Sequence, residues 1–273
     1  MTDVPLRDHV AGLAVRRDGC GPDAPTLVLL HGNGDSADCW PDAVSRWSAT
    51  HHLVAADARG HGSSPRFNPD QLVEPGDVFV ADTVALLEAV RRPGVPLAAI
   101  GHSLGGASLT AACAEHPGLV DALVLIDPPW DIPVIRGPRL DVGAERVLLV
   151  TAYASDPQGE LVLLRGREPG WPESERRAWM AAKAELDLAY VALGAGRPST
   201  PWTEHAPRLS APTLVVTGSD DVLVGHASRA VIGALGNSLV EVAVIPGAGH
   251  YARQDDPDAF HAIVDPWLAA RLQ

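Results

Sequence analysis

Cysteine, positive charge and long apolar runs are all scarce in this chain of 273 residues. The three cysteines, Cys20, Cys39 and Cys113, are odd in number and lack the spacing of metal ligands, which favours a reducing compartment over a disulfide-stabilised secreted domain. No uncharged apolar stretch is long enough to span a bilayer, and the first ten residues do not resemble a signal peptide. We therefore expect a cytoplasmic protein with no metal site.

Lysine and arginine together number 21 against 34 aspartates and glutamates, which gives a net charge of −13. Nucleic acids and anionic membranes are bound by clustered positive charge, so we expect neither as a partner. An acidic, solvated surface is the simpler interpretation of this balance.

Short apolar runs alternate with longer segments of helical spacing. The runs are continuous rather than alternating in polarity, as in parallel strands that are covered on both faces. The strands predicted in this way are Thr26–Leu30, Leu53–Ala56, Leu97–Ile100, Leu123–Ile126, Thr213–Thr217 and Val240–Ile245, and the main helices are Asp77–Arg92, Leu104–His116 and His226–Leu235. This alternation predicts an α/β fold with a mostly parallel sheet and right-handed crossovers.

The alternation stops from about Trp130 to Glu204, where only helical spacing is found. We interpret residues 130–204 as a helical cap, or lid, inserted into a core domain made of residues 1–129 and 205–273. Trp130, Trp171 and Trp179 fall in this insertion, and we expect them to line an aromatic substrate pocket. The charged residues of the cap are expected to form its solvated faces.

A short glycine motif identifies the candidate nucleophile. Gly101, Ser103 and Gly105 form a G-x-S-x-G pattern between the predicted strand LAAI and a predicted helix. A strand that turns at once into a helix strains its central residue and exposes the serine hydroxyl at the top of the sheet. We therefore predict Ser103 as a catalytic nucleophile.

A serine nucleophile needs a base, and the base needs an orienting acid. His250 lies in a glycine-rich loop after the last predicted strand, where a base can reach across the carboxyl edge of the sheet. Asp221 and Asp220 follow the strand TLVVT, and Asp127 follows the strand that ends in VLI. We prefer Asp221 as the acid and keep Asp127 and Asp220 as alternatives.

Acyl transfer also needs hydrogen-bond donors for the oxyanion. The backbone N–H of Leu104, directly after the nucleophile, is one expected donor. The second is expected from the loop His31–Gly34, through the backbone N–H of Asn33.

The motifs HGNG (His31–Gly34), DARGHGSS (Asp57–Ser64), GHSLGG, GSDD and GAGH, in this order, resemble the α/β-hydrolase superfamily, particularly its esterase and lactonase members. The resemblance implies a sheet of about eight strands, a helical cap after the sixth strand and no cofactor. In that family the acid usually stands three residues after the glycine of a GxxD motif, which is Asp221 here.

From these features we expect a serine hydrolase of an apolar or ring-bearing ester or lactone. The same residues also support carbon–carbon bond hydrolysis or perhydrolysis, since sequence motifs do not separate these reactions. A ligand-binding protein that retains the fold without turnover is the alternative from a different class.

Overall fold

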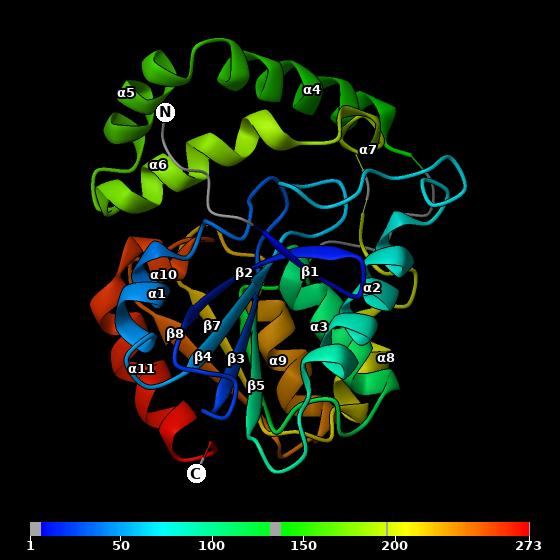
Figure 1. Ribbon diagram of the computed structural model, residues 1–273, viewed down its shortest axis with the longest axis vertical. Coiled ribbons are helices and arrows are strands. Elements are labelled where there is room, and N and C mark those ends of the chain that lie inside the picture. Colours follow the sequence, from blue (N-terminus) through cyan, green and yellow to red (C-terminus); the bar gives the residue numbers. More distant parts are fainter. Residues whose placement is uncertain (1–6, 132–137, 195, 273) are drawn as a thin grey trace.

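Eight strands form one sheet at the centre of the computed structural model, which describes residues 7–131, 138–194 and 196–272 (Figure 1). In spatial order they are β1 (Asp8–Val10), β2 (Leu13–Gly19), β4 (His52–Ala56), β3 (Thr26–Leu30), β5 (Leu97–His102), β6 (Ala122–Ile126), β7 (Thr213–Gly218) and β8 (Val240–Ile245). Neighbouring strands from β4 to β8 are parallel, whereas β2 runs antiparallel to both β1 and β4. The predicted α/β fold with a mostly parallel sheet is therefore confirmed.

The hairpin of β1 and β2 is the part of the sheet that apolar runs do not predict. Its two-residue turn, Ala11 and Gly12, has φ values of 49° and 85°. Positive φ at both positions is typical of tight hairpin turns, whose twist matches that of the strands. The second half of β2 carries exposed polar residues, so it lacks the continuous apolar run of a covered strand.

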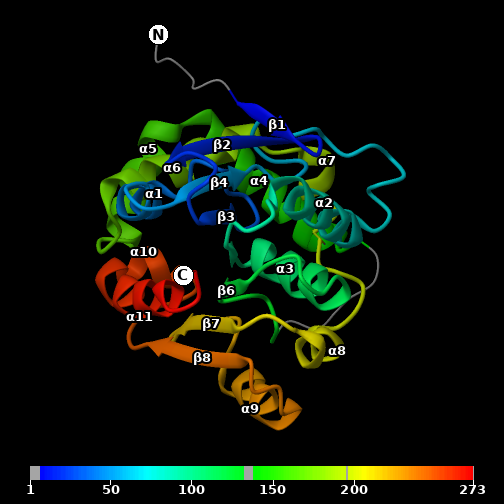
Figure 2. The same cartoon turned by 60° about the horizontal axis from the view of Figure 1, so that its bottom comes forward.

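Residues of the central strands alternate between two hydrophobic cores, one on each face of the sheet. In β3, for example, Val28 and Leu30 belong to one core, and Leu27 and Leu29 belong to the other. The first core is covered by α2 (Pro75–Val90), α3 (Leu104–Glu115) and α9 (His226–Leu235). The second is covered by α1 (Pro41–Trp47), α10 (Ala252–Asp255) and α11 (Pro257–Ala269), on the opposite side of the sheet in Figure 2.

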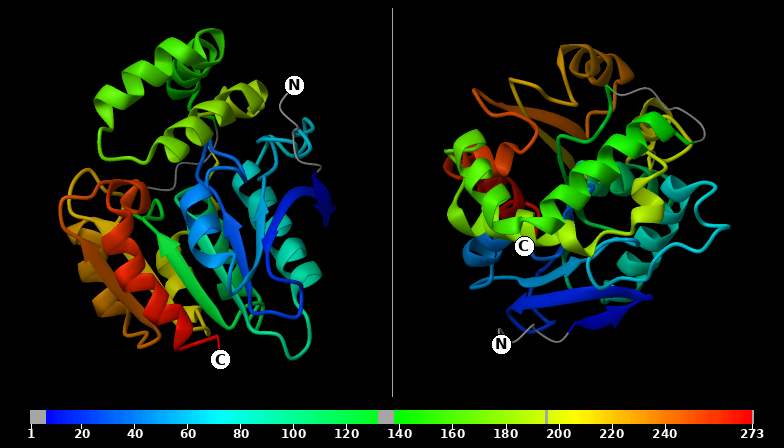
Figure 3. Two further views of the ribbon diagram at one scale, coloured as in Figure 1. Left: turned by 60° about the vertical axis from the view of Figure 1, so that its left-hand side comes forward. Right: turned by 90° about the horizontal axis from the view of Figure 1, so that it is seen from above.

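Between β6 and β7 the described residues form helices and no strand. Four α-helices and a short 3-10 turn form a layer above the carboxyl edge of the sheet (Figure 3). They are α4 (Leu140–Ser155), α5 (Pro157–Arg167), α6 (Glu173–Ala182), η1 (Lys183–Glu185) and α7 (Leu188–Val191). This is the helical insertion expected after the sixth strand, and we call these elements the cap helices.

The last helix of the predicted cap range lies elsewhere. α8 (Trp202–His205) packs against α3 and continues into the 3-10 turn η2 (Ala206–Arg208). The division into a core of 1–129 and 205–273 and a cap of 130–204 stays a prediction. In the described part of the chain, no helix is long and apolar enough to cross a membrane.

A buried ion pair ties the cap helices to the core. Arg253 on α10 donates to both carboxylate oxygens of Glu175 on α6, at 2.5 and 2.9 Å, and to the carbonyl of Cys39 at 2.8 Å. The side chains of Arg253 and Glu175 are only 3% and 1% exposed. Because each charge is buried, neither can lose its partner without a large desolvation penalty.

Candidate active site

Ser103 stands alone between the end of β5 and the start of α3. Its backbone has φ 48° and ψ −110°, a conformation that costs a residue with a side chain about 1–3 kcal/mol. The neighbouring glycines make this turn sterically feasible. A Cβ atom on Gly101 would lie 2.6 Å from the carbonyl carbon of Gly105, and one on Gly105 would lie 2.3 Å from the carbonyl oxygen of Leu30. The glycine spacing is thus dictated by the packing of the elbow.

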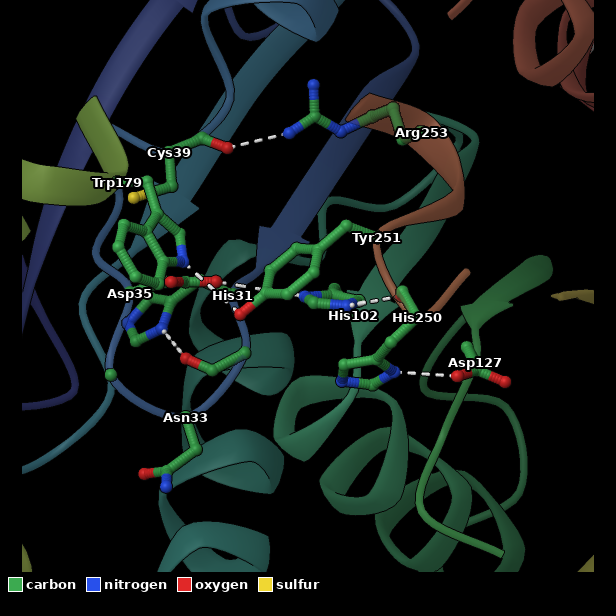
Figure 4. Close-up of polar contacts among 12 residues, drawn as sticks. His31, Asn33, Asp35, Cys39, His102, Asp127, Trp179, His250, Tyr251 and Arg253 are labelled. Atoms are coloured by element: carbon green, nitrogen blue, oxygen red, sulfur yellow. Dashed lines mark hydrogen bonds and ion pairs between the residues drawn. The ribbon is translucent and has the colours of Figure 1, made fainter. Parts of the chain in front are cut away.

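His250 lies in the loop between β8 and α10, at the carboxyl edge of the sheet. Its Nδ1–H donates to Oδ2 of Asp127 at 2.6 Å, and Figure 4 shows the ring turned toward that carboxylate. The backbone of His250 is also held, because Nε2–H of His102 donates to its carbonyl at 3.1 Å. With Nδ1 committed as a donor, Nε2 is the ring nitrogen of His250 that can accept a proton.

Asp127 directly follows β6 and is fully buried. Besides His250 it accepts three hydrogen bonds. Oδ1 accepts from the Thr217 hydroxyl at 2.7 Å and from the Val224 N–H at 2.9 Å, and Oδ2 accepts from the Leu223 N–H at 2.9 Å. These donors fix the carboxylate and balance its charge in a buried place.

The predicted pairing of His250 with Asp221 is therefore wrong, and so is the alternative with Asp220. Asp221 is exposed, and the Asp220 carboxylate accepts instead from the hydroxyl of Ser219. The N–H groups of Ser219 and Asp220 both bind the carbonyl of Ala248, at 2.9 and 3.1 Å. The later backbone N–H groups of this loop, those of Leu223 and Val224, bind the Asp127 carboxylate.

The two predicted oxyanion donors, Asn33 and Leu104, line one cavity together with Ser103 and His250. The N–H of Leu104 is the first of α3, where a helix offers no internal acceptor. Oδ1 of Asn33 accepts from the hydroxyl of Tyr190, a residue of the cap helix α7, at 3.0 Å. Their role as oxyanion donors stays a prediction.

Two buried histidines hold the loop that carries Asn33. Nε2 of His61 accepts from the N–H of Gly34 at 3.1 Å, and Nδ1–H of His61 donates to the carbonyl of Arg59 at 2.9 Å. His31 is bonded in the same way, with Nε2 accepting from the Ala58 N–H at 2.9 Å. Burial lowers the pKa of both rings, that of His61 to about 3, so each stays a neutral acceptor.

Lys183, the single lysine of the chain, reaches from η1 into the core. Its ammonium donates to the carbonyl of Gly34 at 2.5 Å and to Oδ1 of Asp35 at 3.1 Å, and it lies 3.8 Å from the centre of the Trp179 ring. Burial alone would raise the pKa of Asp35, but Lys183 and His102 outweigh burial and hold this pKa well below its usual range. The charge of Lys183 is thus neutralised within the fold.

Of the three predicted pocket tryptophans, only Trp179 lines the cavity. Trp130 is buried in the first core and stacks on Trp202, with ring centres 4.5 Å apart. Trp171 donates to Asp255 at 2.6 Å and packs against Tyr251. The prediction that Trp130 and Trp171 line the pocket is wrong, because neither is among the described residues that line the cavity.

The cavity has a volume of about 520 Å³, which lies within the range of small-molecule sites. Its core-side wall includes Ser103 and His250, and its other wall comes from the cap helices. Apolar side chains of Leu149, Val150 and Leu186 line the cap side. The described residues hold no cluster of histidine, cysteine or carboxylate side chains that could bind a metal ion.

Comparisons with known proteins agree with the fold. The family model described as "Alpha/beta hydrolase family" matches residues 27–263. The curated protein 2-(acetamidomethylene)succinate hydrolase of Mesorhizobium japonicum is 29% identical over 261 residues, which cover 90% of this chain and 87% of that protein.

Two solved structures illustrate the likeness of fold. The enol-lactonase from Burkholderia xenovorans LB400 has a TM-score of 0.72 and 20% identity, over 97% of this chain and 100% of that chain. The esterase RhEst1 from Rhodococcus sp. ECU1013 has a TM-score of 0.70 and 23% identity, over 95% of each chain. At such identities the likeness concerns the fold and not the substrate.

Proposed function

This chain belongs to the alpha/beta hydrolase family, and on that premise we propose that it is a serine hydrolase that cleaves a carboxylic ester or a lactone. Ser103 is the nucleophile, His250 the general base and Asp127 the acid that orients it. The observation that carries the proposal is the 2.6 Å bond from His250 to Asp127, on a cavity that Ser103 also lines. Nucleophile, base and orienting acid in this relation form the triad of acyl transfer.

In the proposed cycle, Nε2 of His250 takes the proton of the Ser103 hydroxyl while Oγ attacks the substrate carbonyl. The N–H groups of Asn33 and Leu104 donate to the oxyanion that forms. Asp127 keeps the proton of His250 on Nδ1 and stabilises the imidazolium. His250 then protonates the departing alkoxide, which leaves an acyl group on Ser103. Water, deprotonated by His250, releases the acid and restores the serine.

A second candidate is hydrolysis of an amide-type bond on the same residues. It is favoured by the relative named 2-(acetamidomethylene)succinate hydrolase, whose named substrate contains an acetamido group. The cycle is the same, except that His250 protonates a departing nitrogen instead of an alkoxide. The two candidates differ in the leaving group alone.

A substrate panel tests the proposal. We expect wild type to hydrolyse p-nitrophenyl esters or a set of lactones, and the Ser103→Ala protein to lose nearly all of this turnover. Ser63→Ala, which removes an exposed hydroxyl, is the matched control and should keep the wild-type rate. The p-nitroanilide of the preferred acyl group tests the amide alternative. Wild-type rates in the Ser103→Ala protein would refute the proposal.

A further inference from the structure

The cavity beside Ser103 has a charge opposite to that of the whole protein. The chain has a net charge of −13, with 34 acidic side chains against 21 basic ones. Yet no aspartate or glutamate is among the described residues that line the cavity, whereas Arg139, Arg146, Lys183 and Arg197 are. An acidic protein that gathers cations around one cavity creates a local field that attracts anions.

These four cations differ in how far the fold already neutralises them. Lys183 is paired with Asp35 inside the protein. Arg139 reaches Asp141 at 3.3 Å, but the Asp141 side chain is 72% exposed, so this pair is weak. Arg146 makes no hydrogen bond or ion pair with any residue that the structure describes.

Arg197 lies close to two of the other cations. It is partly buried, and its pKa is lowered by this burial and by repulsion from Arg146 and Arg139. Three guanidiniums thus share one cavity wall, an arrangement that favours the approach of an anion.

We propose that Arg146 and Arg197 bind a carboxylate of the substrate, so that the substrate is an ester or lactone carrying a free carboxylate away from its scissile carbonyl. This rests on the proposed function of Ser103. A guanidinium presents paired N–H donors that match the two oxygens of a carboxylate, and two guanidiniums can hold one carboxylate from different sides.

The position of the arginines sets the direction in which such a substrate lies. Arg146 is on α4 of the cap and Arg197 follows α7, while Ser103 and His250 belong to loops of the core. Apolar cap residues, among them Val142 and Val150, line the same cavity. The carboxylate would therefore lie at the cap wall and the scissile carbonyl at the core wall, with an apolar part between them.

Two matched esters test the inference. The first is 4-nitrophenyl hydrogen adipate, which carries a free carboxylate, and the second is 4-nitrophenyl 6-methylheptanoate, in which a neutral isopropyl group takes its place. We expect wild type to prefer the charged ester by about tenfold or more in kcat/KM, as for a hydrogen bond to a charged group. The preference should fall with added salt, which screens exposed charges.

Arg146→Gln and Arg197→Gln should each remove most of this preference through a higher KM for the charged ester, and leave the neutral ester within about twofold of wild type. Arg167→Gln is the matched control, because it removes the same charge from the exposed end of α5, outside the cavity. It should leave the preference unchanged.

Two results would overturn the inference while leaving the serine hydrolase in place. One is that wild type hydrolyses the neutral and the charged ester with equal kcat/KM, while the Ser103→Ala protein hydrolyses neither. The other is an Arg146→Gln protein that slows on both esters equally. If neither ester is hydrolysed faster than by the Ser103→Ala protein, the proposed function fails and the inference fails with it.

Discussion

Replacing Asp127 by asparagine separates the geometry of the proposed triad from its charge. The carboxylate accepts from His250 and the Leu223 N–H on Oδ2, and from the Thr217 hydroxyl and the Val224 N–H on Oδ1. An amide has one oxygen, so its NH₂ must face one of these pairs. Facing the Oδ1 pair is less costly, because a hydroxyl can turn round to accept, and only the Val224 N–H then loses its acceptor.

This arrangement predicts two separate effects of Asp127→Asn, one on the free energy of unfolding and one on kcat. One buried donor without an acceptor should lower the free energy of unfolding by about 1–3 kcal/mol. His250 keeps a hydrogen bond to the new side chain but loses the negative charge that stabilises its imidazolium. In a serine protease the corresponding change lowers kcat by about 10⁴-fold, and we expect a loss of that order here.

The assay is initial-rate hydrolysis of p-nitrophenyl butyrate, with urea unfolding of the same samples. Asp221→Asn is the control, since this residue was the acid expected from sequence and its side chain is exposed. It should keep kcat within about threefold, as expected for a surface change outside the site. A large loss in Asp221→Asn together with a nearly active Asp127→Asn would refute the assignment.

Three further changes test the framework of the site. Glu175→Gln should lower the free energy of unfolding in urea by about 3–5 kcal/mol, because the buried Arg253 loses its nearest counter-charge. Glu88→Gln, on the exposed face of α2, should leave the urea midpoint nearly unchanged. Wild type should lose stability as the pH falls from 6.5 toward 3, because the unfolded chain protonates His61 whereas the folded chain, in which the pKa of His61 is about 3, does not. In the His61→Gln protein the slope of the free energy of unfolding against pH should be smaller by up to about 1.4 kcal/mol per pH unit. Equal slopes in the two proteins would contradict this. Gly105→Ala should abolish folding or activity, measured by circular dichroism and ester hydrolysis, because its methyl group would meet a carbonyl of β3 at 2.3 Å.

Much of the core could be predicted because its strands are covered on both faces. Thr26–Leu30 and Val240–Ile245 have the same bounds in the sequence analysis and in the structure, as does the helix His226–Leu235. Ser103 was found by a spacing that sterics impose, since both neighbouring glycines are packed against backbone atoms. The β1–β2 hairpin was not predicted, because part of β2 is exposed and carries no continuous apolar run.

The acid could not be settled from sequence because β6 and β7 are neighbours in the sheet and end at the same edge. Asp127 and Asp221 follow these two strands, so both were suitably placed along the chain. The backbone of the loop after β7 decides between them, since its N–H groups bind Asp127. Such a choice depends on loop conformation, which residue types alone do not specify.

The cap is harder to predict for a similar reason. Trp130 and Trp179 both fall in the predicted insertion, and the sequence around them does not tell them apart. In the structure Trp130 stacks on Trp202 in the core, whereas Trp179 lines the cavity. Arg146 lies on an exposed helix and would pass for part of a solvated face. Only the fold shows that it shares a cavity with Ser103.

The most direct test of the account is to identify the residue that carries the acyl group. Wild type mixed briefly with p-nitrophenyl acetate, quenched in acid and digested, should yield one acetylated peptide, with the acetyl group on Ser103. The Ser103→Ala protein should yield none, and Asp127→Asn should accumulate the acetylated form far more slowly than wild type. An acetyl group on another residue, or ester turnover with Ser103 never modified, would contradict the account.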